Sequence, residues 1–389
     1  MFARTLNLLN ILGNSSSAFL LGARGTGKTY LARQFMKDRR GLTFELLKGE
    51  TFTRYLIHPE YFRHEVEAAL KDDCLTVYVD EVQKLPRLLD EIHQLLSEHQ
   101  GRVRFLLTGS SARKLKRIGA NMLAGRAYTS RLFPLTFMEH SLPIAAALHF
   151  GTLPGVITSE QPSLALRAYY DTYLKEEIIA EAVTRKLAVF TRFLEIAAQY
   201  DGKPVNNSHL ARAIGSTPNT IASYYEILEQ TLIAIRLPGW SKSPRKQLLQ
   251  APKYYFFDCG VLNSIRGELG AAPQPETLRY GNLFENYIIN EFFRLNQYYQ
   301  RDYSFSYWRT KDDQEVDLIC SSGSFGDPIA VEIKSSTQPN KTDFKHLKVF
   351  LQDYPNSKLF CLCNTPRAFI LDGVHVCPWQ EGIKIILGI

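Results

Sequence analysis

The stretch AFLLGARGTGKTYLARQFMK, residues 18–37, decides the fold of the first third of this 389-residue chain. It opens with an apolar run typical of a buried parallel strand and closes with a run of helical composition. Between them, residues 22–29 match the pattern G-x-x-x-x-G-K-[ST] in the strand-then-helix context that this pattern requires. The sequence therefore predicts a phosphate-binding loop at this junction.

The residue types of this loop suit a nucleotide triphosphate. Glycines let backbone N–H groups close around phosphate oxygens, and the following helix N-terminus adds positive partial charge. A lysine at this position reaches the β- and γ-phosphates, and the hydroxyl after it ligates Mg²⁺. We predict that ATP and Mg²⁺ are bound through Gly22, Gly25, Thr26, Gly27, Lys28 and Thr29.

Two further apolar runs end in polar residues. Residues 75–81, LTVYVDE, form a strand candidate that ends in two carboxylates, of which Asp80 is expected to hold the Mg²⁺ shell and Glu81 to polarise the attacking water. Residues 103–108 run into a Gly-Ser-Ser turn, where Ser110 or Ser111 either senses the γ-phosphate or is a simple turn residue.

Arg126, in the segment LAGRA, is a candidate arginine finger that stabilises transition-state charge. The alternatives are a surface arginine and a structural ion pair.

Apolar runs alternate here with amphipathic helical patterns at residues 59–71 and 86–98, which predicts an α/β fold with a doubly wound parallel sheet. The segments DEVQKLP, LTGSSA and LAGRA…RLFPLTFMEH resemble AAA-type ATPases, in particular a bacterial and archaeal family of uncharacterised ATPases with a C-terminal domain of unknown function. Two departures are the loop interior ARGT, where a proline is expected, and GTLP at residues 151–154, where the family has Gly-Gly-x-Pro.

The middle of the chain predicts helices followed by a DNA-binding module. Residues 207–221 predict a helix capped by Ser208, a turn at Gly215 and a second helix opened by Thr217 and Pro218. A strand at residues 232–237 and the basic residues Lys242, Arg245 and Lys246 complete a winged helix-turn-helix.

Two interpretations of this module stay open. In the first, the module binds DNA, and the residues that face a groove are Asn219, Ser223 and Tyr224. In the second, the module only packs against neighbouring domains. Residues 253–260, KYYFFDCG, match an element of the same family; we expect them to end the wing and pack it on the next domain.

The last third contains four residues with a common chemistry. Side chains alternate faces along a strand, so Glu332 and Lys334 in AVEIK project together. The hairpin-like segment before them lets Asp317 meet Glu332. Two carboxylates holding Mg²⁺, with a lysine nearby, can activate water and stabilise the charge of phosphodiester cleavage.

This D…E-x-K arrangement resembles the restriction-endonuclease superfamily, including archaeal Holliday-junction resolvases. The resemblance implies that Glu285, on an amphipathic helix, is an additional acidic metal ligand. The alternative is an ion network of Asp317, Glu332 and Lys334 in a domain that only binds or dimerises.

The resulting organisation is an AAA-type ATPase domain at residues 1–140, a helical connector at 141–186, a winged helix-turn-helix at 187–258 and a nuclease-like α/β domain at 259–389. The net charge of +7 is compatible with a DNA partner. Six cysteines without a CxxC pair indicate reduced, buried thiols and a cytoplasmic location. Asn7 and Asn10 interrupt the first apolar stretch, so we expect no signal peptide, and no run suggests a membrane span.

Three functions follow from these motifs. The first is a DNA-directed ATPase with Mg²⁺-dependent cleavage. The second is a nucleotide-dependent switch, cycling between ATP and ADP, whose last domain is an inactive docking or dimerisation module. The third is transcriptional regulation through the winged helix, which leaves Glu332 and Lys334 without a purpose. A homo-oligomer is left open.

Overall fold

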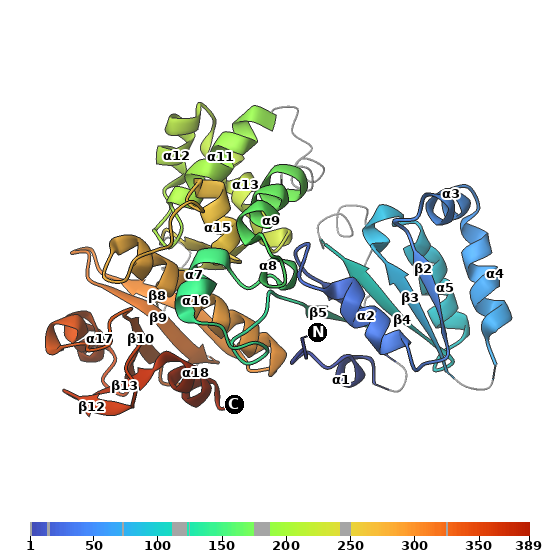
Figure 1. The fold of residues 1–389 in the computed structure, drawn as a ribbon. Helices are drawn as coiled ribbons and strands as arrows, with labels where there is room; N and C mark the ends of the chain where they lie inside the picture. The colour runs from blue at the N-terminus through green and yellow to red at the C-terminus, as the bar shows by residue number, and fades with distance from the viewer. Residues whose placement is uncertain are drawn as a thin grey trace. The chain divides into compact units, whose positions relative to one another are not determined.

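The computed structural model describes residues 2–13, 16–71, 74–110, 123, 125–174, 187–241, 250–323 and 326–389. It divides into two units (Figure 1). Unit 1 comprises Met1–Pro134 and Gln230–Leu232, and unit 2 comprises Leu135–Glu229 and Ile233–Ile389. Among the described helices, none combines the length and hydropathy needed to cross a bilayer.

Unit 1 is built on a parallel five-stranded sheet in the order β2-β3-β4-β1-β5, which confirms the predicted α/β class. Its elements are α1 (Leu8–Leu12), β1 (Ser17–Leu21), α2 (Lys28–Met36), β2 (Gly41–Glu45), α3 (Gly49–Ile57), α4 (Pro59–Ala69), β3 (Leu75–Asp80), η1 (Val82–Lys84), α5 (Leu88–Glu98), β4 (Val103–Gly109) and β5 (Ala127–Arg131).

The core of unit 1 follows the two-residue period of its strands. Phe19, Val77 and Phe105 point to one face of the sheet and pack against Phe62 of α4 and Ile92 of α5. The order of the strands brings the carboxyl ends of β1, β3 and β4 next to one another. In a parallel sheet that edge receives the ligand.

Unit 2 begins with helices and a short hairpin. Its first elements are α7 (Ile144–Phe150), α8 (Pro154–Ile157), α9 (Pro162–Ala168), η2 (Tyr169–Leu174), α11 (Leu187–Gln199), α12 (Asn207–Ile214), α13 (Pro218–Gln230), β6 (Ala234–Leu237) and β7 (Lys253–Phe256). Strands β6 and β7 pair antiparallel, directly after the α12-turn-α13 segment.

The rest of unit 2 is a mixed six-stranded sheet in the order β12-β13-β11-β10-β9-β8. Helix α17 packs on one face with Phe350 in the core, and α16 and α18 contact the sheet as well. The elements are α15 (Cys259–Arg266), α16 (Leu278–Tyr298), β8 (Tyr303–Arg309), β9 (Glu315–Ser322), β10 (Ile329–Ile333), η3 (Lys341–Phe344), α17 (Lys345–Asp353), β11 (Lys358–Cys363), β12 (Phe369–Leu371), β13 (Val374–Pro378) and α18 (Trp379–Leu387).

Two sequence elements that lie about a hundred positions apart meet at Asp258. One carboxylate oxygen accepts from the Thr152 N–H at 2.6 Å, and the other accepts from Val261 at the start of α15 at 3.1 Å. A Cβ atom on Gly260 would lie 2.1 Å from the Phe150 carbonyl oxygen, so the backbones approach too closely for a side chain. The family-like elements at residues 151–154 and 253–260 therefore hold the helical segment against α15.

Asp201 joins the β6-β7 hairpin to α16 in the same unit. Its buried carboxylate accepts from the Phe256 N–H at 2.7 Å and from the Asn286 amide at 2.9 and 3.0 Å. Burial raises the pKa of Asp201 to about 6, against an ordinary value of 3.8, although Arg266 and the hydrogen bonds oppose the shift.

This raised pKa makes the contribution of Asp201 to the free energy of unfolding dependent on pH. Because the folded protein holds the proton more tightly than the unfolded chain, the stability of the wild type relative to Asp201→Asn falls as pH rises from about 4 to above 6. The difference between the ordinary pKa of 3.8 and the pKa of about 6 in the folded protein corresponds to ~3 kcal/mol. Urea unfolding of both proteins at pH 4 and pH 7 measures this difference. Equal changes in the two proteins would show that Asp201 does not titrate differently on folding.

Candidate functional site

The segment at residues 22–29 leads from the end of β1 into the first turn of α2, as the sequence predicts. Gly25 and Gly27 have φ angles of 82° and 95°, a region that side chains disfavour, and Gly27 is the N-cap of α2. A Cβ atom on Gly22 would lie 2.3 Å from the Leu132 carbonyl oxygen. All three glycines are therefore required by backbone geometry, and α2 directs its N-terminal amides toward this loop.

Lys28 lies folded into the loop. Its ammonium donates to the carbonyl oxygens of Gly22 at 2.8 Å and Ala23 at 3.2 Å, and the residue is 5% exposed. The Thr26 hydroxyl also donates to Ala23, at 2.9 Å, and Arg4 donates to the Thr26 carbonyl at 2.9 Å. The loop is thus closed by its own cation and hydroxyl, and the ammonium must leave these carbonyls to contact a phosphate.

Thr29 and Asp80 meet at the end of β3. The Thr29 hydroxyl lies 3.2 and 3.3 Å from the two carboxylate oxygens of Asp80, and the Thr108 hydroxyl donates to the same carboxylate at 2.5 Å. A hydroxyl and a carboxylate that lie side by side supply the oxygen ligands that Mg²⁺ prefers. The residues therefore fit the ion that accompanies ATP.

Glu81 and Ser110 are joined by a residue that the sequence analysis missed. Gln83 donates from its amide nitrogen to the Glu81 carboxylate and, at 3.1 Å, to the Ser110 hydroxyl. Glu81 itself has φ of 56°, an uncommon value for a side-chain-bearing residue. Gln83 in DEVQ gave no separate signal, because its role depends on the turn after β3. Ser111 lies outside the described residues.

Arg126 does not lie with these residues. It precedes β5, whose first residue pairs with Ser17 at the start of β1, whereas the loop follows the other end of β1. Its guanidinium donates to the Ser97 hydroxyl at 2.5 Å and to the His93 carbonyl at 3.3 Å, both on α5. These contacts favour the alternative of a structural role for Arg126, and the arginine finger stays a prediction.

In unit 2, β9 and β10 pair antiparallel with Leu318 opposite Val331, so Asp317 and Glu332 occupy the next position along the ladder. Asp317 accepts from the Ile333 N–H at 2.7 Å. Lys334 forms an ion pair with Glu332 at 2.5 Å. The structure thus brings together the three residues of the D…E-x-K arrangement.

Glu332 retains one oxygen suited to a cation. The residue is 3% exposed, and its buried Oε2 atom has no hydrogen-bond partner among the residues that the structure describes. Burial, followed by the Asp317 charge, holds the pKa of Glu332 well above its usual range, although Lys334 opposes the shift. A buried oxygen without a partner is costly, and a divalent ion beside Asp317 and Glu332 would satisfy it.

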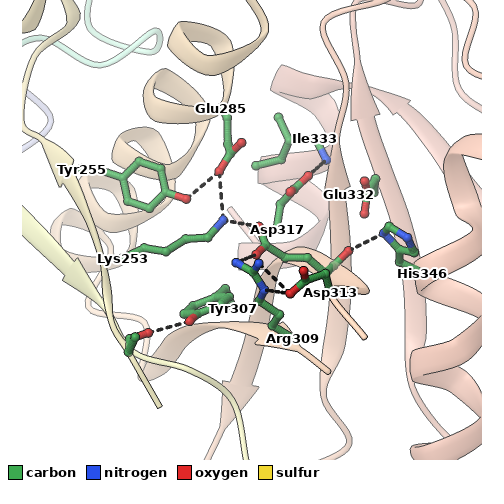
Figure 2. Close-up of polar contacts among 12 residues, drawn as sticks. Lys253, Tyr255, Glu285, Tyr307, Arg309, Asp313, Asp317, Glu332, Ile333 and His346 are labelled. Carbon is green, nitrogen blue, oxygen red and sulfur yellow. Dashed lines mark hydrogen bonds and ion pairs between the residues drawn. The ribbon is translucent and has the colours of Figure 1, made fainter. Parts of the chain in front are cut away.

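Glu285 of α16 has a different partner, shown in Figure 2. Its Oε1 atom accepts from the Tyr255 hydroxyl at 2.6 Å and lies 3.5 Å from the Lys253 ammonium. Lys253 also donates to Glu315 at the start of β9. Burial raises the pKa of Glu285 to about 7, the Lys253 charge opposes this, and the Asp317 charge adds to it.

The predicted metal ligands Glu285, Asp317 and Glu332 are not gathered around one point. In the part of the chain that the structure describes, one trio of acidic or histidine side chains places its ligand atoms within 4.8 Å of one another, at Glu67, Glu98 and His99 of unit 1. Lys253, Tyr255 and Glu315 were missed by the sequence analysis because their meeting depends on three separate elements.

The α12-α13 segment changes two expectations. Asn206, rather than Ser208, caps α12, because its side chain accepts from the amides of Ser208 and His209. Tyr224 is 3% exposed and packs against Phe193, so it does not face a groove. Asn219 and Ser223 are exposed, as expected. The basic residues Lys242, Arg245 and Lys246 lie outside the described residues.

The parallel sheet, the glycine loop and the Thr29–Asp80 pair are the features of a P-loop ATPase domain, and they support the binding and hydrolysis of ATP by unit 1. A family model described as an AAA domain matches residues 14–141. Models of two domains of unknown function, DUF8612 and DUF4143, match residues 144–272 and 280–381.

The chain is similar to other proteins over much of its length. An uncharacterised protein of Mycobacterium tuberculosis is 27% identical over 386 residues, 97% of this chain and 81% of that protein. An uncharacterised protein of Haemophilus influenzae is 22% identical over 326 residues, 77% of this chain and 78% of that protein. A Walker-type ATPase of Pyrococcus abyssi has 18% identity and a TM-score of 0.45, with 67% of this chain and 93% of that chain covered.

The loop geometry yields a direct test of nucleotide binding. Lys28→Ala removes a contact made to the phosphates in the ground state, so ATP affinity should be lost rather than turnover merely slowed. Titration with a fluorescent ATP analogue measures this. Lys37→Ala, at the exposed far end of the same helix, serves as the control. If Lys28→Ala binds ATP as tightly as the wild type, residues 22–29 are not part of the nucleotide-binding site.

Proposed function

We propose that this chain couples ATP hydrolysis to the binding and Mg²⁺-dependent cleavage of DNA. The observation that carries the proposal is the arrangement on β9 and β10, where Asp317, Glu332 and Lys334 converge. Within the described part of the chain, one buried oxygen of Glu332 has no hydrogen-bond partner. In this proposal residues 187–258 act as a winged helix, and residues 259–389 act as a restriction-endonuclease-like domain.

In unit 1 the roles follow from position. The amides of the loop and α2 hold the phosphates, and Lys28 neutralises their charge. Thr29 and Asp80 would hold Mg²⁺, and Glu81 is the carboxylate that would orient the attacking water. Gln83 ties Glu81 to Ser110, so a change at the phosphate end of the site alters the position of this carboxylate.

In unit 2, Asp317 and Glu332 are the residues that would hold a divalent ion. Such an ion lowers the pKa of bound water and polarises a phosphodiester. Lys334 is partly exposed beside Glu332, so its ammonium can also stabilise the negative charge that develops on a phosphate. The Ile333 amide fixes the Asp317 carboxylate in place.

DNA binding is supported by the order of elements α12, turn, α13, β6 and β7, which is that of a winged helix. Asn219 and Ser223 lie on the exposed side of α13, and the net charge of +7 favours a polyanion.

A second candidate function is a nucleotide-dependent switch whose last domain docks or dimerises without cleavage. Lys334 already pairs with Glu332, and Lys253 with Glu285. Cations of the chain itself therefore partly neutralise the acidic cluster, by which we mean Glu285, Glu315, Asp317 and Glu332. In this case ATP and ADP states would differ in assembly or partner binding.

Hydrolysis is tested with Glu81→Gln. The amide keeps the shape of the side chain but cannot act as a base, so kcat should fall by roughly 10²–10⁴-fold while ATP still binds. Phosphate release measures turnover, and Glu50→Gln, exposed on α3, is the matched control. Undiminished turnover would exclude Glu81 as the base. If this variant assembles alike with ATP and ADP, the switch function fails.

Cleavage is tested with Asp317→Asn on duplex, branched and single-stranded DNA in Mg²⁺. Changing residues that only hydrogen-bond the ligands of a metal costs about 10–100-fold in metal affinity or activity, so loss of a charged ligand should reduce cleavage by at least about 100-fold. Asp313→Asn, an exposed aspartate in the turn before the same strand, is the control. Equal products from the wild type and Asp317→Asn would reject the nuclease function.

A further inference from the structure

Lys253 is a cation in an unusual place. It lies on β7 of the hairpin, yet its side chain is 2% exposed and ends among carboxylates of α16 and β9. Figure 2 shows the ammonium directed at Glu285, on the side of the cluster away from Glu332. A lysine ammonium is normally kept in water, and burying it is costly unless it is paired.

The partners of Lys253 account for its burial. The ammonium pairs with Glu315 and lies 3.5 Å from Glu285 Oε1, and it also lies 5.1 Å from the centre of the Tyr307 ring. The Tyr307 hydroxyl is held by the Ala251 carbonyl, so this ring is fixed beneath the lysine. The position of the ammonium is therefore determined by three elements rather than by a flexible side chain.

Glu285 is committed to the same arrangement. Its Oε1 atom receives both the Tyr255 hydroxyl and the Lys253 ammonium. A divalent ion bound through Oε1 would have to compete with both donors, and an ion at either oxygen of Glu285 would lie close to a fixed positive charge. The ligand atoms of Glu285, Asp317 and Glu332 are also not within 4.8 Å of one another.

We propose that Lys253 is a cation supplied by the chain itself, which occupies the Glu285 side of the acidic cluster and leaves a site for one divalent ion at Asp317 and Glu332. The inference rests on the proposed function, and it departs from the expectation that Glu285 is a metal ligand. Lys253 thereby also links the β6-β7 hairpin to the cluster.

The test is the number of Mn²⁺ ions bound by the full chain, measured by calorimetric titration without nucleotide. All variants carry Asp80→Asn to remove the carboxylate of the P-loop site. Ions bound elsewhere, for example at Glu67, Glu98 and His99, contribute equally and cancel in the differences. Asp317→Asn identifies the ion bound at the acidic cluster.

Two results are expected. Glu285→Gln should change the affinity of the Asp317-dependent ion by less than about threefold, because Glu285 is not its ligand. Lys253→Met should gain one Mn²⁺ ion, and the double variant with Glu285→Gln should lose it again. Lys253→Arg keeps the charge and should gain none.

The outcomes separate the two proposals. A tenfold or greater loss of affinity in Glu285→Gln, or no added ion in a folded Lys253→Met, overturns the assignment of Lys253. If Lys253→Met does not fold, the Glu285→Gln result decides alone. In a third outcome, Asp317→Asn loses no ion, while Lys253→Met gains an ion that Glu285→Gln removes. The nuclease function then fails, while the assignment of Lys253 stands.

Discussion

Arg294 and Glu291 form a buried ion pair at 3.1 Å on α16, and the packing of unit 2 depends on how these charges are satisfied. The Arg294 guanidinium also donates to the carbonyls of Leu135 and Phe257, and Glu291 accepts from the Phe137 N–H. Breaking such a pair leaves an uncompensated charge and costs several kcal/mol. One helix of the last domain thus fixes the segment that follows unit 1 and the end of the hairpin.

The same constraint governs both candidate sites. In the loop of unit 1, the Lys28 ammonium is satisfied by two carbonyls, contacts that phosphate oxygens can replace without leaving the charge unpaired. In unit 2, Lys253 is satisfied by carboxylates, a stronger arrangement that a neutral or cationic ligand cannot replace. The Lys28 ammonium can therefore exchange carbonyl contacts for phosphate contacts, whereas the Lys253 ammonium is part of the framework.

Local patterns predicted much of this molecule. The strand before Gly22, the helix from Lys28 and the meeting of Asp317 with Glu332 follow from spacing and from alternation along strands. The sequence could not predict contacts between distant elements. Gln83 reaches Ser110 across a turn, and Lys253 meets Glu285 only after the hairpin folds onto α16. The prediction for Tyr224 was wrong because the helical period alone does not show which side of α13 packs against Phe193.

The hairpin strand β7 connects the two chemistries proposed for unit 2. Lys253 enters the acidic cluster, Tyr255 bonds Glu285, and the backbone of Phe256 is held by Asp201 and Asn290. A displacement of the hairpin relative to α16 would therefore move both groups that contact Glu285, the Lys253 ammonium and the Tyr255 hydroxyl. Because Asp317 is fixed separately by the Ile333 amide, such a displacement would change the charge around the cluster without removing the Asp317–Glu332 pair. The arrangement gives the hairpin, which is part of the proposed winged helix, a physical route to the acidic residues through one ammonium and one hydroxyl.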